Sequence, residues 1–368
     1  MKKLCLIIAI SFCVVLFFCA AEAPACSAFK VTAQDGTIVS GRTMEFGVDM
    51  HYALVVIPRN KVFISPVPDK GAGLQWKTKY GYVGINALGK EEGVSDGINE
   101  AGLSFSLLWY DNDMQWQDVG SKEKASALAN IMMGTWILSS FSNVDEVAQG
   151  IKKVRVFGLK NPEMGGMVIP AHFIVHDARG GCIVIEYEKG EARIYDNPLG
   201  IMTNAPNFPW MLTNLRNYVG MSEKMLEPSA FGGATYNTTG HGSGMFGLPG
   251  DITPPARFVR MAVMTKLADK PANAEGALNL AQHIVNSLDI IRGMAVDRDK
   301  EGKIIASETT QWSTYRDLTN RIYYFRTYDN LNMRRIDLTK INFQTDKVKT
   351  IKMFEDREII LDITDRAK

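Results

Sequence analysis

The first 25 residues constrain the rest of the chain most, because they have the three-part pattern of an export signal. Lys2 and Lys3 form a charged start, residues 5–21 carry no charge, and Ala23-Pro24-Ala25 has the small-x-small pattern of a cleavage site. We expect cleavage after Ala25 and export to the periplasm or out of the cell. A retained anchor is the alternative, since an apolar run of 17 residues is near the minimum for spanning. No other stretch is apolar enough, so we expect no permanent membrane span.

Composition and charge exclude several classes of protein. The chain is 46% hydrophobic and 22% charged, which is ordinary for a globular protein. Beyond residue 25 there are 39 basic and 39 acidic side chains. Nucleic-acid binding needs a basic surplus, so we expect no nucleic-acid partner. Without an internal repeat or a linker, residues 26–368 are predicted to form one domain.

The expected cut makes Cys26 the first residue of the mature chain, and such a cysteine permits two chemistries. In one, the free α-amine (pKa about 8) takes the proton of the neighbouring thiol (about 8.5), which then acts as a nucleophile. In the other, Cys26 carries a lipid anchor and the protein binds a hydrophobic ligand without turnover. Lipoproteins usually have leucine where this chain has Ala23, which disfavours the anchor. An inert, buried cysteine is the third interpretation.

Other sites known from local motifs are not indicated. The chain has no His-Glu-x-x-His, no paired Cys-x-x-Cys and no Gly-x-Ser-x-Gly, and His172 and His176 are better explained by packing on one strand face than by metal binding. We therefore expect no metal and no organic cofactor. His241 is interpreted as a solvated loop residue. Cys182 is the other cysteine of the mature chain, and a disulfide between it and Cys26 stays open.

The hydrophobic pattern predicts strands and helices in blocks. Asp35-Gly36 between two alternating runs predicts a hairpin, and the opening third is expected to be antiparallel sheet. Helices are predicted over 122–139, from an N-cap at Ser142 onward, and over 274–288. The glycine-rich segment 232–250 is predicted to be a flexible loop. Blocks of this kind favour an α+β fold with segregated helices. Further strands are predicted over 53–58, 82–87, 102–109, 172–176, 182–187, 192–195, 310–317 and 321–328.

Several segments of the mature chain, in order, carry the motifs of one enzyme family. They are Cys26-Ser27-Ala28-Phe29, Gly41-Arg42-Thr43-Met44-Glu45-Phe46, Asp96-Gly97-Ile98-Asn99-Glu100-Ala101-Gly102-Leu103, Thr203-Asn204-Ala205-Pro206, Gly247-Leu248-Pro249-Gly250-Asp251, Arg257-Phe258 and Thr310-Gln311-Trp312. This set resembles the choloylglycine hydrolase family, the linear amide C-N hydrolases that include bile salt hydrolases and penicillin V acylases. The resemblance implies a four-layer αββα fold of the N-terminal-nucleophile type. It also implies a small-molecule amide substrate and, as in many members, a homotetramer.

The resemblance also implies roles for individual residues. Cys26 would be the nucleophile, and Arg42 would stabilise its thiolate. Glu45 stands where the family usually has an aspartate that bonds the amino terminus. Asn204 would donate to the oxyanion, and Arg257 would support the amine and the developing charge.

Trp109 departs from the asparagine or tyrosine that relatives carry at its position. An indole does not reproduce the geometry of a side-chain amide, so we assign only its backbone N–H to the oxyanion hole and expect its ring to contact the acyl group. This favours an aryl-acyl or fatty-acyl amide over conjugated bile acids. Penicillin V, conjugated bile salts and acyl-homoserine lactones all stay open as substrates.

Overall fold

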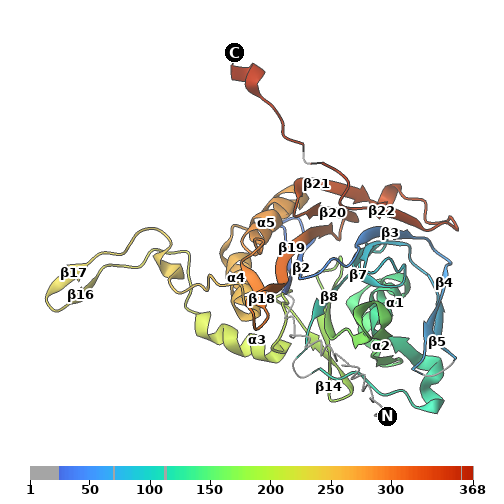
Figure 1. Ribbon diagram of the computed structural model, residues 1–368. Helices are drawn as coiled ribbons and strands as arrows, with labels where there is room; N and C mark the ends of the chain where they lie inside the picture. The colour runs from blue at the N-terminus through green and yellow to red at the C-terminus, as the bar shows by residue number, and fades with distance from the viewer. Residues whose placement is uncertain (1–24, 69–70, 112–113, 358, 368) are drawn as a thin grey trace, which may run out of the picture.

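Two antiparallel β-sheets lie face to face in the middle of the molecule (Figure 1). The computed structural model describes residues 25–368 except 69–70, 112–113, 358 and 368, so the expected signal in 1–24 lies outside the described residues. The first sheet contains, in spatial order, β1 (Cys26–Thr32), β2 (Ile38–Phe46), β19 (Ile304–Asp317), β20 (Ile322–Thr327) and β21 (Asn330–Asp337), with β18 (Ala295–Arg298) beside β19. The second contains β15 (Glu191–Asp196), β14 (Cys182–Glu188), β13 (Ala171–His176), β8 (Ser104–Trp109), β7 (Val94–Asn99), β6 (Tyr82–Asn86), β3 (Ala53–Ile57) and β22 (Lys349–Lys352).

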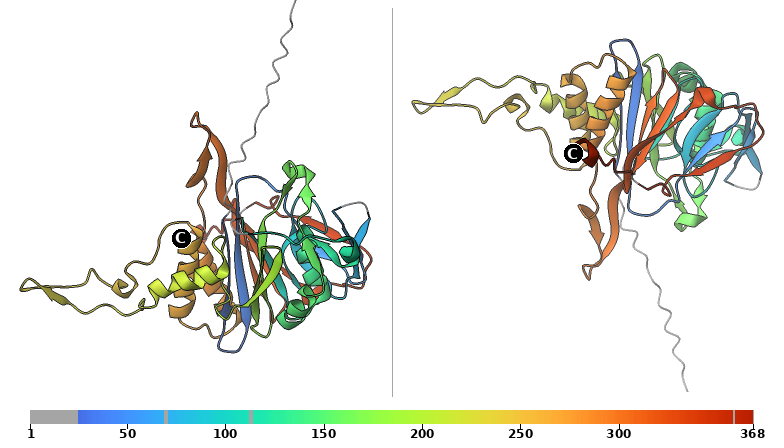
Figure 2. Two further views of the ribbon diagram at one scale, coloured as in Figure 1. Left: turned by 90° about the horizontal axis from the view of Figure 1, so that it is seen from below. Right: turned by 90° about the horizontal axis from the view of Figure 1, so that it is seen from above.

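Helices cover the outer face of each sheet (Figures 1 and 2). On the first sheet, α4 (Pro254–Leu267) and α5 (Ala274–Asn286) pack against β1 and β2, and α3 (Phe208–Leu215) lies against α4. On the second sheet, α1 (Met133–Ser140) packs on β7 and β8, and α2 (Val144–Ile151) packs on β14. The four layers α/β/β/α confirm the expected α+β sandwich.

Buried side chains fill both the space between the sheets and the space under the helices. Ile85, Ile98 and Trp312 belong to the inner cluster, whereas Phe105 and Phe173 belong to the cluster under α1 and α2. Each fully buried side chain of this size contributes roughly 1.5–3 kcal/mol through removal of apolar surface from water. The alternation of the strands therefore places one set of residues in each core.

The predicted helix over 122–139 is wrong in its first half. A short 3-10 turn (Ser121–Ser126) is followed by β9 (Ala127–Ala129), which pairs in parallel with β10 (Arg155–Phe157), and the α-helix begins at Met133. Ala127, Leu128 and Ala129 are all buried, because this strand packs against β4 (Val62–Pro66), β5 (Ala72–Lys77) and β10. A buried strand of three residues has no periodicity that would distinguish it from a helix turn.

The helix expected from Ser142 begins one residue later. Asn143 is its N-cap, and its side-chain oxygen accepts a hydrogen bond of 3.0 Å from the Glu146 N–H. Ser142 instead donates its backbone N–H to the Glu146 carboxylate at 2.8 Å. Asn143 thus satisfies one free donor at the start of α2, and Asp177 Oδ2 accepts another from the Val144 N–H at 3.0 Å.

The segment 232–250, predicted to be a flexible loop, begins at the turn of a short hairpin that projects far from the sandwich (Figure 2). Its strands are β16 (Ser229–Phe231) and β17 (Ala234–Tyr236), joined by Gly232 and Gly233, which both have positive φ angles of 57° and 83°. Two such residues suit the tight turn of a two-residue hairpin.

Two further small pairs are β4 (Val62–Pro66) with β5 (Ala72–Lys77), and β11 (Lys160–Asn161) with β12 (Met167–Val168). Across the described parts of the chain, no helix is both long enough and apolar enough to cross a membrane.

Candidate active site

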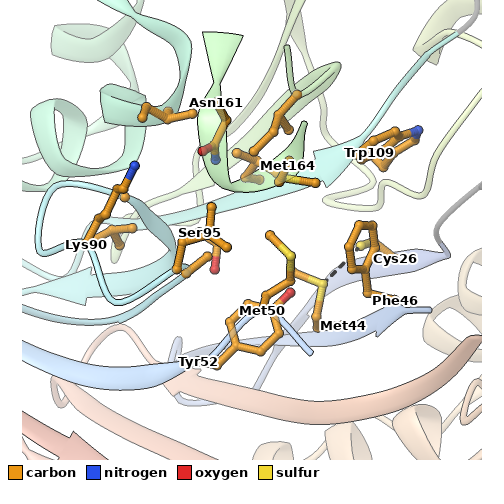
Figure 3. A pocket seen from close by; sticks show the side chains of 17 residues that line it. Cys26, Met44, Phe46, Met50, Tyr52, Lys90, Ser95, Trp109, Asn161 and Met164 are labelled. Atoms are coloured by element: carbon orange, nitrogen blue, oxygen red, sulfur yellow. Dashed lines mark hydrogen bonds between the residues drawn. The ribbon is translucent and has the colours of Figure 1, made fainter. Parts of the chain in front are cut away.

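Cys26 is the first residue of β1, at the place where the two sheets and helix α4 meet. Its register partner on β2 is Met44, and the Met44 Sδ lies 3.8 Å from the Cys26 Sγ. Only 2% of Cys26 is exposed, although its sulfur lines a cavity (Figure 3). The sulfur is therefore shielded from bulk water but accessible from one side.

The groups around the thiol act on its pKa in opposite directions. Burial raises the pKa of Cys26 above its ordinary value, and the Glu45 carboxyl adds to this effect. Arg42, whose Nη2 lies 4.0 Å from Sγ, lowers the pKa, as do a hydrogen bond from the Trp109 backbone N–H and the charge of Arg257. A thiol in such a place stays protonated until a nearby base takes its proton.

The backbone nitrogen of Cys26 has its own set of partners. It donates to Asn204 Oδ1 at 2.7 Å, and the same oxygen accepts from Arg257 Nη2 at 2.8 Å. Arg257 projects from α4, is fully buried, and also donates to the Cys26 carbonyl at 2.5 Å and to Ser27 Oγ at 2.6 Å. Asn204 Nδ2 donates to the Trp109 carbonyl at 2.9 Å. These contacts fix the backbone of the cysteine between β8 and α4.

The orientation of Asn204 differs from the expectation that its side chain would serve mainly as an oxyanion donor. Its oxygen faces the Cys26 nitrogen, and one hydrogen of its amide group is used by the Trp109 carbonyl. The second amide hydrogen is the one that remains for a substrate oxygen.

Arg42 is held rigidly between the two sheets. Its Nη1 donates to the Ser95 carbonyl at 3.0 Å and lies 3.6 Å from Asp96 Oδ2, while Nη2 donates to the Leu107 carbonyl. The guanidinium carbon is 4.8 Å from the ring centroid of Trp312, within reach of a cation–π interaction. Asp96 is also bound by side chains of both sheets, namely Ser106, Thr314, Arg316 and Tyr323. The arginine beside the thiol is thus fixed by a buried polar network.

Glu45 points to the face of β2 opposite Arg42 and Met44, toward the helices. Its Oε1 accepts a hydrogen bond of 2.7 Å from Thr310 Oγ1, and no described residue bonds its Oε2. Burial raises the pKa of Glu45 to about 7, although the nearby charge of Arg257 lowers it. The Cys26 nitrogen bonds Asn204 here, so a bond from Glu45 to the amino terminus stays a prediction for the mature chain.

An apolar cavity leads to the thiol. Phe46 and Trp109 stand beside Cys26 at one end, with their ring centroids 5.8 Å apart, and Lys90 and Asn161 stand at the other end (Figure 3). The space open to a water molecule inside it is about 70 Å³, so the cavity is narrow. Other lining residues are Met44, Met50, Tyr52, Leu88, Ser95, Leu107, Ile131, Met164 and Ile169.

The other candidate residues from the sequence have structural partners. His172 bonds Glu186 Oε1 through Nδ1 at 3.1 Å and the Thr203 carbonyl through Nε2 at 2.8 Å, so it holds the segment that carries Asn204. His176 Nε2 lies 3.0 Å from the Gly200 carbonyl. Among the described residues, no cluster of His, Cys, Asp and Glu could hold a metal ion. Cys26 and Cys182 are both free thiols in this structure.

Three contributors to the site were not predicted from the sequence. Ser27 bonds Arg257, Thr310 bonds Glu45, and Asp96 anchors Arg42. Asp96 and Thr310 both lie within motif segments, so the sequence indicated that these residues matter but not which side chains they bind. Ser27 lies within a motif segment too, directly after the nucleophile.

Comparison with known proteins gives the family. The model of the linear amide C-N hydrolases, choloylglycine hydrolase family, matches residues 26–351, so the chain belongs to this family. The bile salt hydrolase/transferase of Clostridium perfringens is 30% identical over 336 residues, which cover 89% of this chain and 96% of that protein. The penicillin V acylase of Pectobacterium atrosepticum is 24% identical over 83% of this chain and 78% of its own length.

Solved structures agree. A variant of the conjugated bile acid hydrolase from Clostridium perfringens superimposes with a TM-score of 0.79 and 26% identity, covering 92% of this chain and 99% of that one. The penicillin V acylase from Agrobacterium tumefaciens has a TM-score of 0.71 at 22% identity, covering 88% and 90%, and supports the fold. The protein is a linear amide C-N hydrolase with the fold of the bile acid hydrolases and penicillin V acylases.

Proposed function

We propose that the protein is an exported amidase in which Cys26, as the amino-terminal residue, attacks a linear, non-peptide amide. The observation that carries this proposal is the position of the Cys26 sulfur at the end of an apolar cavity, with the nitrogen of the same residue held 2.7 Å from Asn204. The substrate is of the penicillin V or conjugated bile salt type. The family match beginning at residue 26 and the signal pattern before it support removal of residues 1–25.

The steps of the reaction follow from these positions. The free α-amine of Cys26 takes the thiol proton, and the sulfur forms a bond to the amide carbonyl carbon. The negative charge moves to the carbonyl oxygen, which the backbone N–H of Trp109 and the second N–H of Asn204 would stabilise by donating hydrogen bonds. The C–N bond then breaks as the amine leaving group takes the proton from the α-ammonium. Water hydrolyses the resulting thioester with the α-amine again as base.

Arg42 and Arg257 have separate tasks in this scheme. Arg42 lies beside the sulfur and favours the thiolate, whereas Arg257 holds the backbone of Cys26 and the oxygen of Asn204. Glu45 lies close enough to influence the charge of both Cys26 and Arg257. In the mature chain it would stabilise the α-ammonium that forms during the attack.

A substrate panel tests the proposal. Purified protein that begins at Cys26 is incubated with penicillin V, glycocholate, taurocholate and acyl-homoserine lactones, beside Cys26→Ser and Cys26→Ala. We expect turnover of at least one amide and its loss by a factor of at least about 10³ in Cys26→Ala, because the nucleophile is absent. Full activity of Cys26→Ala would contradict the assignment. Preference for acyl-homoserine lactones would favour the alternative acylase.

Mass spectrometry of the exported protein tests the lipid-anchored alternative. Cys26 is 2% exposed, so a lipid attached to its sulfur would not fit the observed packing. We expect the mass of residues 26–368 without a modification. A mass increase equal to a diacylglycerol group and a fatty acid would overturn the enzyme proposal, and a chain that begins elsewhere yet hydrolyses amides would overturn the role of the α-amine.

A further inference from the structure

The two ends of the cavity differ in chemistry. Next to Cys26 it is lined by aromatic and thioether side chains, whereas polar groups stand at the far end, where Lys90 enters from a loop and Asn161 from the end of β11 (Figure 3). A cavity that is apolar along most of its length and polar at its end selects for shape first and for one polar group second.

Asn161 has a buried donor without a partner. The residue is 2% exposed, and its Oδ1 caps a short turn by accepting from the Glu163 N–H at 3.1 Å. Its Nδ2 has no hydrogen-bond partner among the described residues. Leaving such a group unpaired costs roughly 1–3 kcal/mol, so its retention in the wall of a ligand cavity calls for an explanation.

Lys90 adds positive charge at the same end. Its Nζ lies 3.4 Å from Glu163 Oε1, two residues after Asn161 along the chain. An ammonium group has three donors, and this ion pair occupies one direction. The far end of the cavity therefore offers hydrogen-bond donors and attracts an electron-rich atom.

We propose that Asn161 determines specificity by donating its Nδ2 hydrogens to an oxygen at the end of the acyl group remote from the scissile amide, with Lys90 beside it. The substrates would be N-acyl amides whose acyl group is apolar along its length and carries a hydroxyl, keto or ether oxygen at its far end. This inference rests on the proposed function, because it assumes that the acyl group occupies the cavity next to Cys26. A site that donates a hydrogen bond to a substrate oxygen discriminates strongly against analogues that lack this oxygen, because the buried donor is then left without a partner.

Matched substrate pairs test the inference. Amides of one amine, taken from the best substrate of the panel, are prepared with straight acyl chains of eight to sixteen carbons, each with and without a terminal hydroxyl. At the best chain length we expect a kcat/KM at least about tenfold higher for the hydroxylated member, mainly through a lower KM. Equal kcat/KM for every pair would overturn the inference and leave the proposed function intact. No turnover of either member, together with inactivity on the whole panel, would instead contradict the proposed function.

Asn161→Asp, measured at alkaline pH, is the decisive variant, because an ionised carboxylate keeps the oxygen that caps the turn but has no hydrogen to donate. We expect it to abolish the preference for the hydroxylated substrate, so that the two members of each pair have equal kcat/KM. Met164→Leu, which changes the same cavity wall without touching a hydrogen bond, is the matched control and should keep the preference. Asn161→Ser, with a hydroxyl oxygen in place of the cap, serves if Asn161→Asp fails to fold. An equal loss on both substrates in the folded variant would show a merely structural role and overturn the proposal.

Discussion

At the scale of single residues, the chemistry of Cys26 depends on a balance between burial and charge. Burial raises the pKa of the thiol, and Arg42 is the largest opposing influence. Arg42 keeps its position because Asp96 and two backbone carbonyls bind it. The site therefore combines a shielded sulfur with a fixed positive charge beside it, and Arg257 adds a smaller effect of the same sign.

Replacing Arg42 tests this balance. Arg42→Met removes the positive charge 4.0 Å from Sγ, so the pKa of the thiol should rise further. The acid limb of the kcat/KM–pH profile should move upward by about one pH unit or more. Arg42→Lys, which keeps the charge, is the control and should move the limb less. An unchanged limb in Arg42→Met would show that Arg42 does not act on the thiol.

Glu45 should make stability depend on pH in a chain that begins at Ala25, where Cys26 is still in a peptide bond. Its pKa is raised from 4.5 to about 7, so the folded state binds a proton more tightly than the unfolded state. The stabilisation is complete below pH 4.5 and is lost as pH rises to about 7, an effect on the order of 3 kcal/mol. Urea unfolding at pH 5 and pH 8 measures it. Glu45→Gln should flatten the difference, and a slope that persists in this variant would point to another group.

The sequence predicted which residues would meet at the site, but not how they bond. Cys26, Arg42, Trp109, Asn204 and Arg257 do surround one sulfur and one nitrogen. The orientation of the Asn204 amide depends on three partners from three elements, and no local pattern encodes that. Residue types are read from motifs, whereas hydrogen-bond directions follow from packing.

At the scale of elements, long alternating strands were predictable and short elements were not. β1, β2, β13 and β14 each have buried runs next to turn residues, so their patterns are strong. Helices α3 and α4 were missed. Helix α4 begins at Pro254-Pro255 and buries Arg257 and Arg260 among apolar side chains, so its hydrophobic face is interrupted by charge.

The start of α2 gives a test at this scale. Asn143→Ala should lower the free energy of unfolding by about 1 kcal/mol, because the Glu146 N–H loses its acceptor. Ser142→Ala keeps its backbone bond to Glu146 and loses only the hydroxyl's bonds to the Glu146 and Asn143 side chains, so it should cost less. Urea denaturation of both variants at pH 7 measures the difference. Equal losses, or a larger loss in Ser142→Ala, would contradict the assignment of Asn143 as the cap.

At the scale of the whole molecule, the projecting segment 219–250 is the feature that a single copy does not explain. It exposes large apolar side chains, with 72% of Val219, 68% of Phe231 and 89% of Phe246 accessible. Apolar side chains gathered on one projection mark a surface for association. The homotetramer that the resemblance implies stays a prediction.

Association is testable by light scattering after size-exclusion chromatography. We expect the mature wild type to have the mass of four copies, and the double variant Phe231→Ser/Phe246→Ser to have a smaller mass, because its projection loses apolar contact area. Ile64→Ser removes a side chain that is 51% exposed on β4 and is the control. A wild type with the mass of one copy would refute the prediction.

The backbone around Ala25 bears on the proposed removal of residues 1–25. Ala25 is 4% exposed, and its carbonyl accepts a hydrogen bond of 2.9 Å from the Glu45 N–H, which extends the pairing of β1 with β2. A peptidase binds its target segment in an extended form within its own active-site cleft. A peptide bond whose neighbours are already paired in a β-sheet is not accessible to it. If an external peptidase removes the leader, it must act before this edge of the sheet forms. Processing and folding would then be in competition, and a precursor that folded first would keep its future catalytic amine sequestered.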